Sequence, residues 1–137
     1  MAALLVVTGV TALDDAGSVA ATSRCTASST LSTSGEFHAP AKRGEVWALA
    51  LGAVPPMVDQ TLKIVWRVTG KGPLRVHFRD PSGRAHPLSF GPQRHGASSF
   101  RHPGAEWGTG FAFDAPGCWT VRVTRTGADA TVGIRVT

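Results

Sequence analysis

Four stretches of this chain carry an apolar side chain at every second position. They are 61–69, 74–79, 118–125 and 130–137. A period of two is typical of a β-strand with one face buried and the other in water. The pattern predicts four strands whose apolar rows face a core, and Trp66 is expected to anchor that core from a central strand.

Turn sequences separate these stretches. Asp80-Pro81-Ser82-Gly83 has Pro and Gly at the positions that a type I turn favours. The run from Asp114 to Gly117 predicts a tight turn that joins 107–113 and 118–125 into a hairpin. A fifth stretch, from Glu45 to Leu51, is apolar on both faces and predicts a covered strand.

Short strands with frequent turns and no helical period indicate the fold class. About seven strands with turns every 8–12 residues or so are typical of an all-β fold, and we expect an immunoglobulin-like antiparallel β-sandwich of about seven strands. A lipocalin-like barrel is the alternative. The strands after Gly44 are too few and too short to close one.

Composition divides the chain into three parts. Residues 2–13 are an apolar run of signal-peptide length without a preceding positive charge, so we expect 1–21 to be a signal-peptide-like leader. That run is shorter than the roughly 20 residues a membrane span needs, and no transmembrane segment is expected in the mature form. Residues 22–42 predict a Ser/Thr-rich tether, and 43–137 predict the sandwich domain of a secreted or cell-surface protein.

The chain has two cysteines, Cys25 and Cys118. In a secreted chain they predict one disulfide, which closes a loop of about 90 residues and is worth roughly 4 kcal/mol in the chain-entropy model. Thr22-Ser23-Arg24 before Cys25 is not a lipobox, so lipidation is not expected. Neither cysteine has neighbours at zinc-ligand spacing, and no metal site or cofactor is expected.

Basic residues exceed acidic ones, 14 against 9, for a formal net charge of +5. If the four alternating strands share one sheet, six basic side chains project from its solvent face together with His77, while the acids Asp59, Asp80, Asp114 and Asp129 fall in turns or elsewhere. The six are Lys63, Arg67, Arg75, Arg79, Arg122 and Arg135. Such a face would attract anionic wall polymers, phospholipid head groups or acidic glycans. The alternative is that the face has no binding function and is a solvated sheet surface, on which the aliphatic parts of the arginine side chains cover apolar strand surface.

The segment 89–104 is the longest without periodicity, and 89–106 is the second candidate site. His86, His95 and His102 are spaced by nine and seven residues, which matches no metal signature. Ser98 or Ser99 can be combined on paper with a histidine and with Glu106 or Asp114, but no Gly-x-Ser-x-Gly motif accompanies them, and we expect no enzyme.

Trp47, Trp66 and Trp119 are expected to face inward, which leaves Trp107 as an exposed aromatic for stacking on sugars. Exposed aromatics do not alternate with the basic residues, so no nucleic-acid partner is expected.

The segment from Trp107 to Val123 contains Gly-Thr-Gly-Phe-x-Phe-x-x-Pro-Gly-Cys-Trp. It resembles the C-terminal motif of a family of small secreted proteins and lipoproteins of Gram-positive bacteria, over about the last third of the chain. The resemblance implies an extracytoplasmic β-sandwich and transfers no catalytic residue. The missing lipobox departs from the lipid-anchored members.

Together these observations predict a non-catalytic secreted or cell-surface binding or accessory module, directed at an anionic polymer or glycan through a basic sheet face. The alternative is a carbohydrate-binding or protein-inhibitor domain that uses the 89–106 loop.

Overall fold

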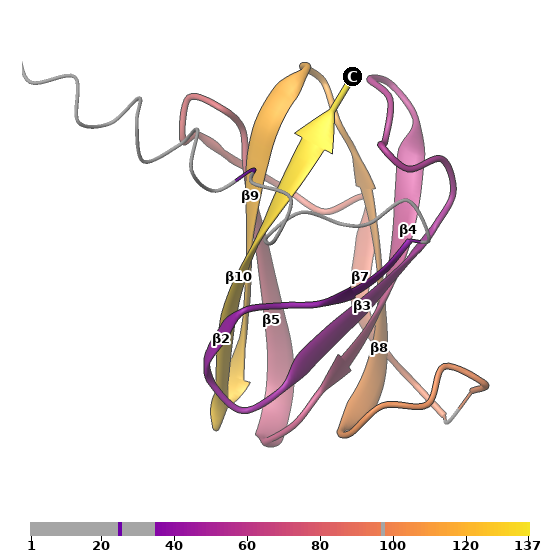
Figure 1. The fold of residues 1–137 in the computed structure, drawn as a ribbon, viewed down its shortest axis with the longest axis vertical. Coiled ribbons are helices and arrows are strands. Elements are labelled where there is room, and N and C mark those ends of the chain that lie inside the picture. Colours follow the sequence, from indigo (N-terminus) through magenta and orange to yellow (C-terminus); the bar gives the residue numbers. More distant parts are fainter. Residues whose placement is uncertain (1–24, 26–34, 97) are drawn as a thin grey trace, which may run out of the picture.

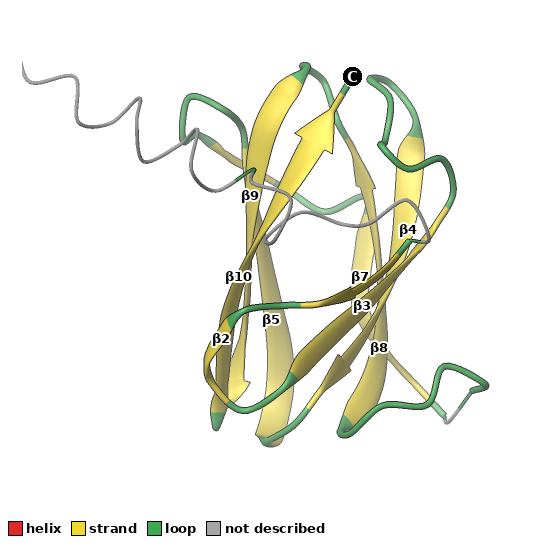
Figure 2. Ribbon diagram, in the orientation of Figure 1, coloured by secondary structure: helices red, strands yellow, loops and turns green. Residues whose placement is uncertain are grey.

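The computed structural model describes residue 25 and residues 35–96 and 98–137 of the chain, which form two antiparallel five-stranded sheets packed as a sandwich (Figures 1 and 2). The first sheet has the order β1 (Glu36–His38), β3 (Val46–Leu51), β4 (Thr61–Val68), β8 (Ala105–Ala112) and β7 (Phe90–His95). The second has the order β2 (Ala41–Arg43), β10 (Ala128–Val136), β9 (Gly117–Thr126), β5 (Lys71–Arg79) and β6 (Ala85–His86). The all-β prediction is confirmed, with ten strands rather than seven.

Eight of these strands follow the immunoglobulin-like order. In sequence order, β3 to β10 arrange as β3-β4-β8-β7 against β10-β9-β5-β6. This is the ABED sheet against the GFC sheet, with β6 added beside the third strand of the latter. The immunoglobulin-like prediction is therefore correct in its topology as well as its class.

The two remaining strands, β1 and β2, come from 36–43, which the sequence places mostly in a tether. β1 pairs with β3 in the first sheet and β2 pairs with β10 in the second, so this ribbon crosses between the layers (Figure 1). Ala39 and Pro40 lie at the crossing, where the missing N–H of proline ends the ladder. The predicted leader, 1–21, lies outside the described residues.

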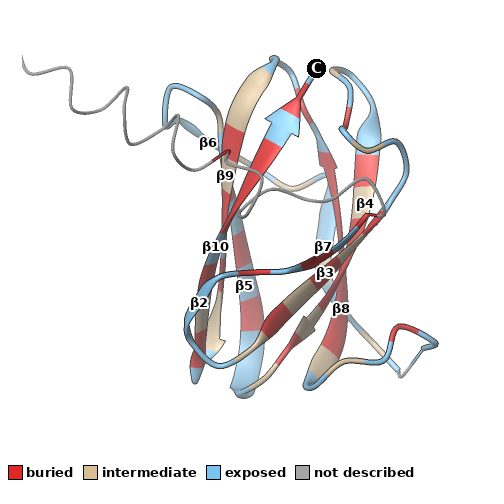
Figure 3. Ribbon diagram, in the orientation of Figure 1, coloured by how far each residue is buried: buried red, intermediate tan, exposed pale blue. Residues whose placement is uncertain are grey.

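Two tryptophans, one from each sheet, are fully buried in the core. Trp66 on β4 donates its Nε1–H to Thr109 Oγ1 at 2.9 Å, and Trp119 on β9 donates to the carbonyl of Ala115 at 2.9 Å. Phe78 of the second sheet stacks on Phe111 of the first, with ring centroids 4.0 Å apart. All four predicted apolar rows face this core, and exposed and buried residues alternate along β5 (Figure 3).

The connection between β8 and β9 differs from the prediction. The two strands belong to different sheets, so the run from Asp114 to Gly117 carries the chain from one layer to the other and does not close a hairpin. Phe113, just before this run, is fully buried between the layers. A Pro-Gly turn fits both connections, and local turn chemistry does not select between them.

The predicted disulfide is confirmed. Cys25 and Cys118 are bonded, which fixes residue 25 to the beginning of β9. The described part of the chain contains no helix that could cross a membrane.

Candidate functional site

The six predicted basic residues do not share one surface. Lys63 and Arg67 lie on β4, which belongs to the first sheet, whereas the other four lie on strands of the second sheet. The prediction of one six-residue face is wrong because a period of two separates inside from outside but does not assign a strand to a layer.

Arg67 has a structural role. Its Nε donates to the carbonyl of Phe100 at 2.9 Å and its Nη1 to the carbonyl of Gly104 at 2.9 Å. Its Nε also lies 3.4 Å from Glu106 Oε1, and its side chain is only 11% exposed. Arg67 therefore fastens the 98–104 loop to the outer face of the first sheet through bonds to two backbone carbonyls and its ion pair with Glu106.

The outer face of the second sheet retains a basic cluster. Arg75 and His77 on β5 and Arg122 on β9 are exposed there, and His77 lies directly opposite Arg122 in the ladder. Arg43, at the end of β2, reaches the same face because it is paired with Asp129 on β10. A surface hollow of about 350 Å³, which we call the basic hollow, is lined by residues that include these four and the acid Asp129.

Asp129 and Arg122, which both line the basic hollow, form an ion pair. Arg122 Nε donates to Asp129 Oδ1 at 3.3 Å and Nη2 to Oδ2 at 3.1 Å. These bonds hold the pKa of Asp129 below its ordinary value, with added attraction from Lys42 and Arg43, and raise the pKa of Arg122. The prediction that Asp129 lies in a turn away from the basic rows is wrong, since β10 already begins at Ala128.

Arg43 and Arg75 are exposed cations of this cluster, and the Asp129 carboxylate that attracts Arg43 is already hydrogen-bonded to Arg122. Neither makes an ion pair with a described residue. Arg43 could not be predicted from sequence, because its three-residue strand is too short for a period to show and its position depends on pairing with β10.

The last two predicted residues, Arg79 and Arg135, lie on the same face but farther along it. At about 3.4 Å per residue, Arg79 is about 14 Å from Arg75 along β5, and Arg135 is about 20 Å from Asp129 along β10. Arg79 donates to the carbonyl of Gly83 at 2.9 Å, and Arg135 to that of Cys25 at 3.5 Å. Both flank the disulfide end of the sheet and do not line the hollow.

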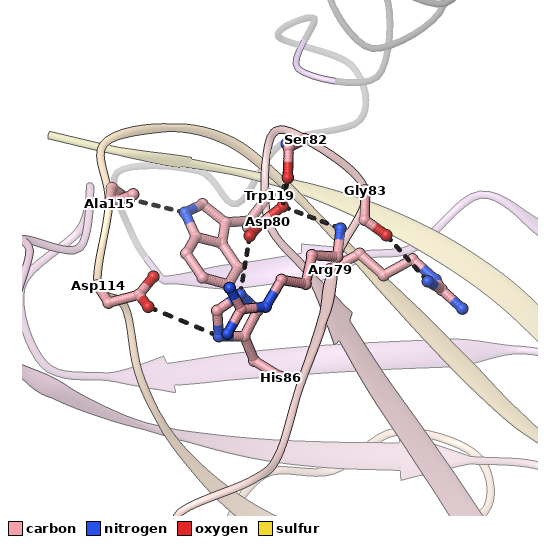
Figure 4. A network of polar contacts seen from close by, with 9 residues as sticks. Arg79, Asp80, Ser82, Gly83, His86, Asp114, Ala115 and Trp119 are labelled. Carbon is pink, nitrogen blue, oxygen red and sulfur yellow. Dashed lines mark hydrogen bonds and ion pairs between the residues drawn. The ribbon is translucent and has the colours of Figure 1, made fainter.

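A second polar network surrounds His86, at the edge of the second sheet (Figure 4). His86 Nε2 lies 2.8 Å from Asp80 Oδ2, and its Nδ1 lies 3.6 Å from Asp114 Oδ2. Asp80 also accepts hydrogen bonds from the hydroxyl of Ser82 and from the backbone of Ser82 and Arg84. Bonds from Ser82 and His86 are the main reasons why the pKa of Asp80 is far below its ordinary value.

The network has the character of a closed turn. The Asp80 carboxylate caps the turn between β5 and β6, and the ring of His86 packs against Trp119 with centroids 5.0 Å apart. Within the described residues no group of three or more His, Cys, Asp or Glu is placed to hold a metal ion.

A third polar cluster is centred on Glu106 of β8, only 4% exposed. Ser98 Oγ donates to Glu106 Oε1 at 2.5 Å, and His95 Nδ1 lies 3.4 Å from Oε2. Ser98, His95 and Glu106, which the sequence allowed to be combined as a Ser-His-acid triad, therefore lie close together. The carboxylate of Glu106, however, lies between the serine and the histidine. Nucleophilic activation needs the imidazole against the hydroxyl, with the acid behind it, and this arrangement differs from that order.

The two tryptophans nearest the solvent exchange their expected roles. Trp47 points outward from β3, and it is covered by His38 and His102, whose rings stack on it at 4.1 and 3.7 Å. Trp107, expected to be exposed, is 8% exposed and faces inward.

Arg94 and Arg125 lie over the ring of Trp107 at 5.3 and 5.6 Å. Burial, with the nearby charge of Arg94, lowers the pKa of Arg125. An open aromatic platform for sugars is thus not formed by either Trp47 or Trp107.

Part of the segment 89–106 forms a strand that the sequence does not predict. Phe90–His95 forms β7, an edge strand whose register shifts between Phe90 and Gln93. The following loop borders a hollow of about 780 Å³ lined by Arg67, Ser98, Ser99, Arg101, His102 and Pro103. Its cations are Arg67, already engaged by Glu106, and the exposed Arg101.

No protein-family model matches this chain, and no curated protein or solved structure matches it either. The resemblance of the Trp107–Val123 segment to secreted Gram-positive proteins stays a prediction.

Proposed function

We propose that this protein is a non-catalytic, secreted or cell-surface binding module that attaches to an anionic polymer through the outer face of its second sheet. The observation that carries the proposal is the basic hollow. Two unpaired arginines, Arg43 and Arg75, converge there with His77 and Arg122 from three different strands. The arginines that line the hollow outnumber its one carboxylate, Asp129, and such an excess of clustered positive charge attracts polyanions.

The predicted basic residues contribute to this surface only in part. Of the six basic residues selected from sequence, only Arg75 and Arg122 contribute to the hollow; Arg79 and Arg135 extend the same face toward the disulfide. A disulfide persists in oxidising compartments, which supports a secreted or surface location.

Retention on immobilised heparin at low and physiological salt tests the proposal. We expect the protein to bind at about 10 mM salt and to elute well before 150 mM, because the screening length falls from about 30 to 8 Å over that range. The double variant Arg43→Glu/Arg75→Glu should lose this retention. Both side chains are exposed and unpaired, so the fold should persist, which circular dichroism checks.

The matched control is Lys63→Glu/Arg101→Glu. It makes the same change in net charge, four units below +5, but on the first sheet and in the 98–104 loop. Retention by the control together with loss by Arg43→Glu/Arg75→Glu supports the proposal. Equal loss of heparin retention in both variants would mean that retention depends on net charge alone, and would contradict the proposal. Loss by the control only would favour the alternative, a glycan or protein site at the 89–106 segment.

A further inference from the structure

The basic hollow contains an acid, and a carboxylate weakens the pull of a cationic site on a simple anion. Asp129 is nevertheless held there by two hydrogen bonds from Arg122, and its side chain is 14% exposed. The hollow is therefore a mixed donor and acceptor surface, and its ligand should carry more than negative charge.

Each member of the Arg122–Asp129 pair keeps capacity for a ligand. A guanidinium has five N–H donors, and the two bonds to Asp129 leave three of them. A carboxylate offers about four lone-pair directions, of which Arg122 takes two. The pair thus presents a donor beside an acceptor, which is the pattern that complements a hydroxyl group.

The remaining residues favour a compact anion with several oxygens. Arg43, Arg75 and His77 border the same hollow of about 350 Å³, at the small end of the usual range for ligand sites. Three side chains that converge on so small a volume need several acceptor atoms on one centre. A phosphate supplies these and matches the guanidinium fork, whereas a carboxylate supplies only two.

Resting on the function proposed above, we infer that the basic hollow recognises a polyol phosphate. Arg43, Arg75 and His77 bind the phosphate, and the Arg122–Asp129 pair binds a hydroxyl on the carbon chain that carries it. Asp129 is thereby the specificity residue of the site, because it accepts a hydrogen bond from a ligand hydroxyl and repels anions that have no hydroxyl.

Titration of the full chain with glycerol 1-phosphate, propyl phosphate and inorganic sulfate, followed by calorimetry or NMR, tests this inference. Propyl phosphate has the same charge and a similar length but no hydroxyl. We expect glycerol 1-phosphate to bind about tenfold more tightly than propyl phosphate, the ratio that one hydrogen bond to a charged group supplies, and sulfate to bind least.

The variant Asp129→Ala separates hydroxyl recognition from charge. It should abolish the tenfold preference for glycerol 1-phosphate, while propyl phosphate should bind several-fold more tightly because Arg122 loses its counter-ion. Arg75→Ala is the matched control, since it should weaken both phosphates equally. A thermal melt of each variant shows that the fold is intact.

Other results overturn the inference without touching the proposed function. Equal binding of the two phosphates by the unaltered protein, or equal weakening of both in Asp129→Ala, removes the role of Asp129. Heparin retention that depends on Arg43 and Arg75, with no binding of either small phosphate, leaves a polyanion surface without a polyol phosphate site. Absence of both kinds of binding overturns the inference and the proposed function together.

Two sources can present a polyol phosphate, and a second arm distinguishes them. Vesicles of phosphatidylcholine with phosphatidylglycerol display the group on a lipid, and soluble poly(glycerol phosphate) displays it on a polymer. Sedimentation with the vesicles supports a lipid head group, and capture by the polymer alone supports a soluble or wall-bound chain. Both sources are phosphodiesters, so binding to neither while glycerol 1-phosphate still binds assigns the site to a terminal phosphate monoester. Binding to neither source and not to glycerol 1-phosphate overturns the inference.

Discussion

Replacing Glu106 with Gln tests how the outer face of the first sheet is held together. The Glu106 carboxylate contacts Ser98 of the loop, Arg67 of β4 and His95 of β7. Glutamine keeps the size and one carbonyl oxygen but removes the charge. The change therefore leaves the guanidinium of Arg67, 11% exposed, without its counter-ion.

The expected loss follows from that burial. Breaking a buried ion pair at one partner typically costs about 3–5 kcal/mol. Arg67 keeps its bonds to two backbone carbonyls in the variant, so we expect a smaller loss, about 2–3 kcal/mol of unfolding free energy. For a sandwich of this size, each kcal/mol lowers Tm by about 4–8 °C. The predicted fall in Tm is about 8–24 °C.

Urea unfolding followed by tryptophan fluorescence measures the loss. Glu45→Gln is the control: Glu45 is half-exposed and 3.9 Å from His38, so its loss should stay below about 0.5 kcal/mol. Arg67→Met combined with Glu106→Gln should regain most of the stability, because no buried charge then lacks a partner. A Glu106→Gln variant as stable as the control, or a double variant as weak as the sum of its parts, would refute the reasoning.

Three further changes have defined outcomes. Gly104→Ala should lower the unfolding free energy, measured in urea, by about 1–3 kcal/mol more than Gly83→Ala. Both glycines have positive φ, but only at Gly104 would a Cβ overlap the backbone of β4; equal losses of stability in the two variants would contradict this. Asp80→Asn should be less stable than the unaltered protein at pH 7. The difference in unfolding free energy should narrow gradually as pH falls below about 4, because a lowered pKa contributes its full stability above the ordinary value near 3.8 and loses it as pH falls toward the lowered pKa of the folded state; a difference that stays constant in acid urea titrations would exclude this reasoning. Cys25→Ser with Cys118→Ser should cost about 4–5 kcal/mol in guanidinium unfolding, since the disulfide joins residues 93 apart, and an unchanged midpoint would argue against it.

The inward and outward rows were predictable from sequence, whereas their assignment to sheets was not. Every position that alternation in β4, β5, β9 and β10 assigns to the core is buried, including Trp66 and Trp119, whereas Ala128 of β10, expected in a turn, also belongs to the core. The same alternation fits a strand in either layer. The sequence therefore does not show that β4 lies in a different sheet from β5, β9 and β10. Only long-range pairing separates Arg67 from Arg75.

Outward aromatic residues were the second limit. β3 is apolar on both faces, and its outer face is covered by His102 from a loop that lies 55 positions later in the chain. No local sequence pattern around Trp47 predicts that His102 covers it. β7 escaped notice for a related reason: it is an edge strand with a register shift and Pro92, so it has no regular period.

The outermost strands of the sandwich have a consequence for how copies of this protein behave in a crowd. β1, β2 and β6 span three, three and two residues, and the ladder of β7 is interrupted by its register shift. Such borders offer a neighbouring molecule almost no continuous row of open amides to extend. Edge-to-edge addition of a second copy into a continuous sheet, the first step toward fibrils, is thereby disfavoured at these borders.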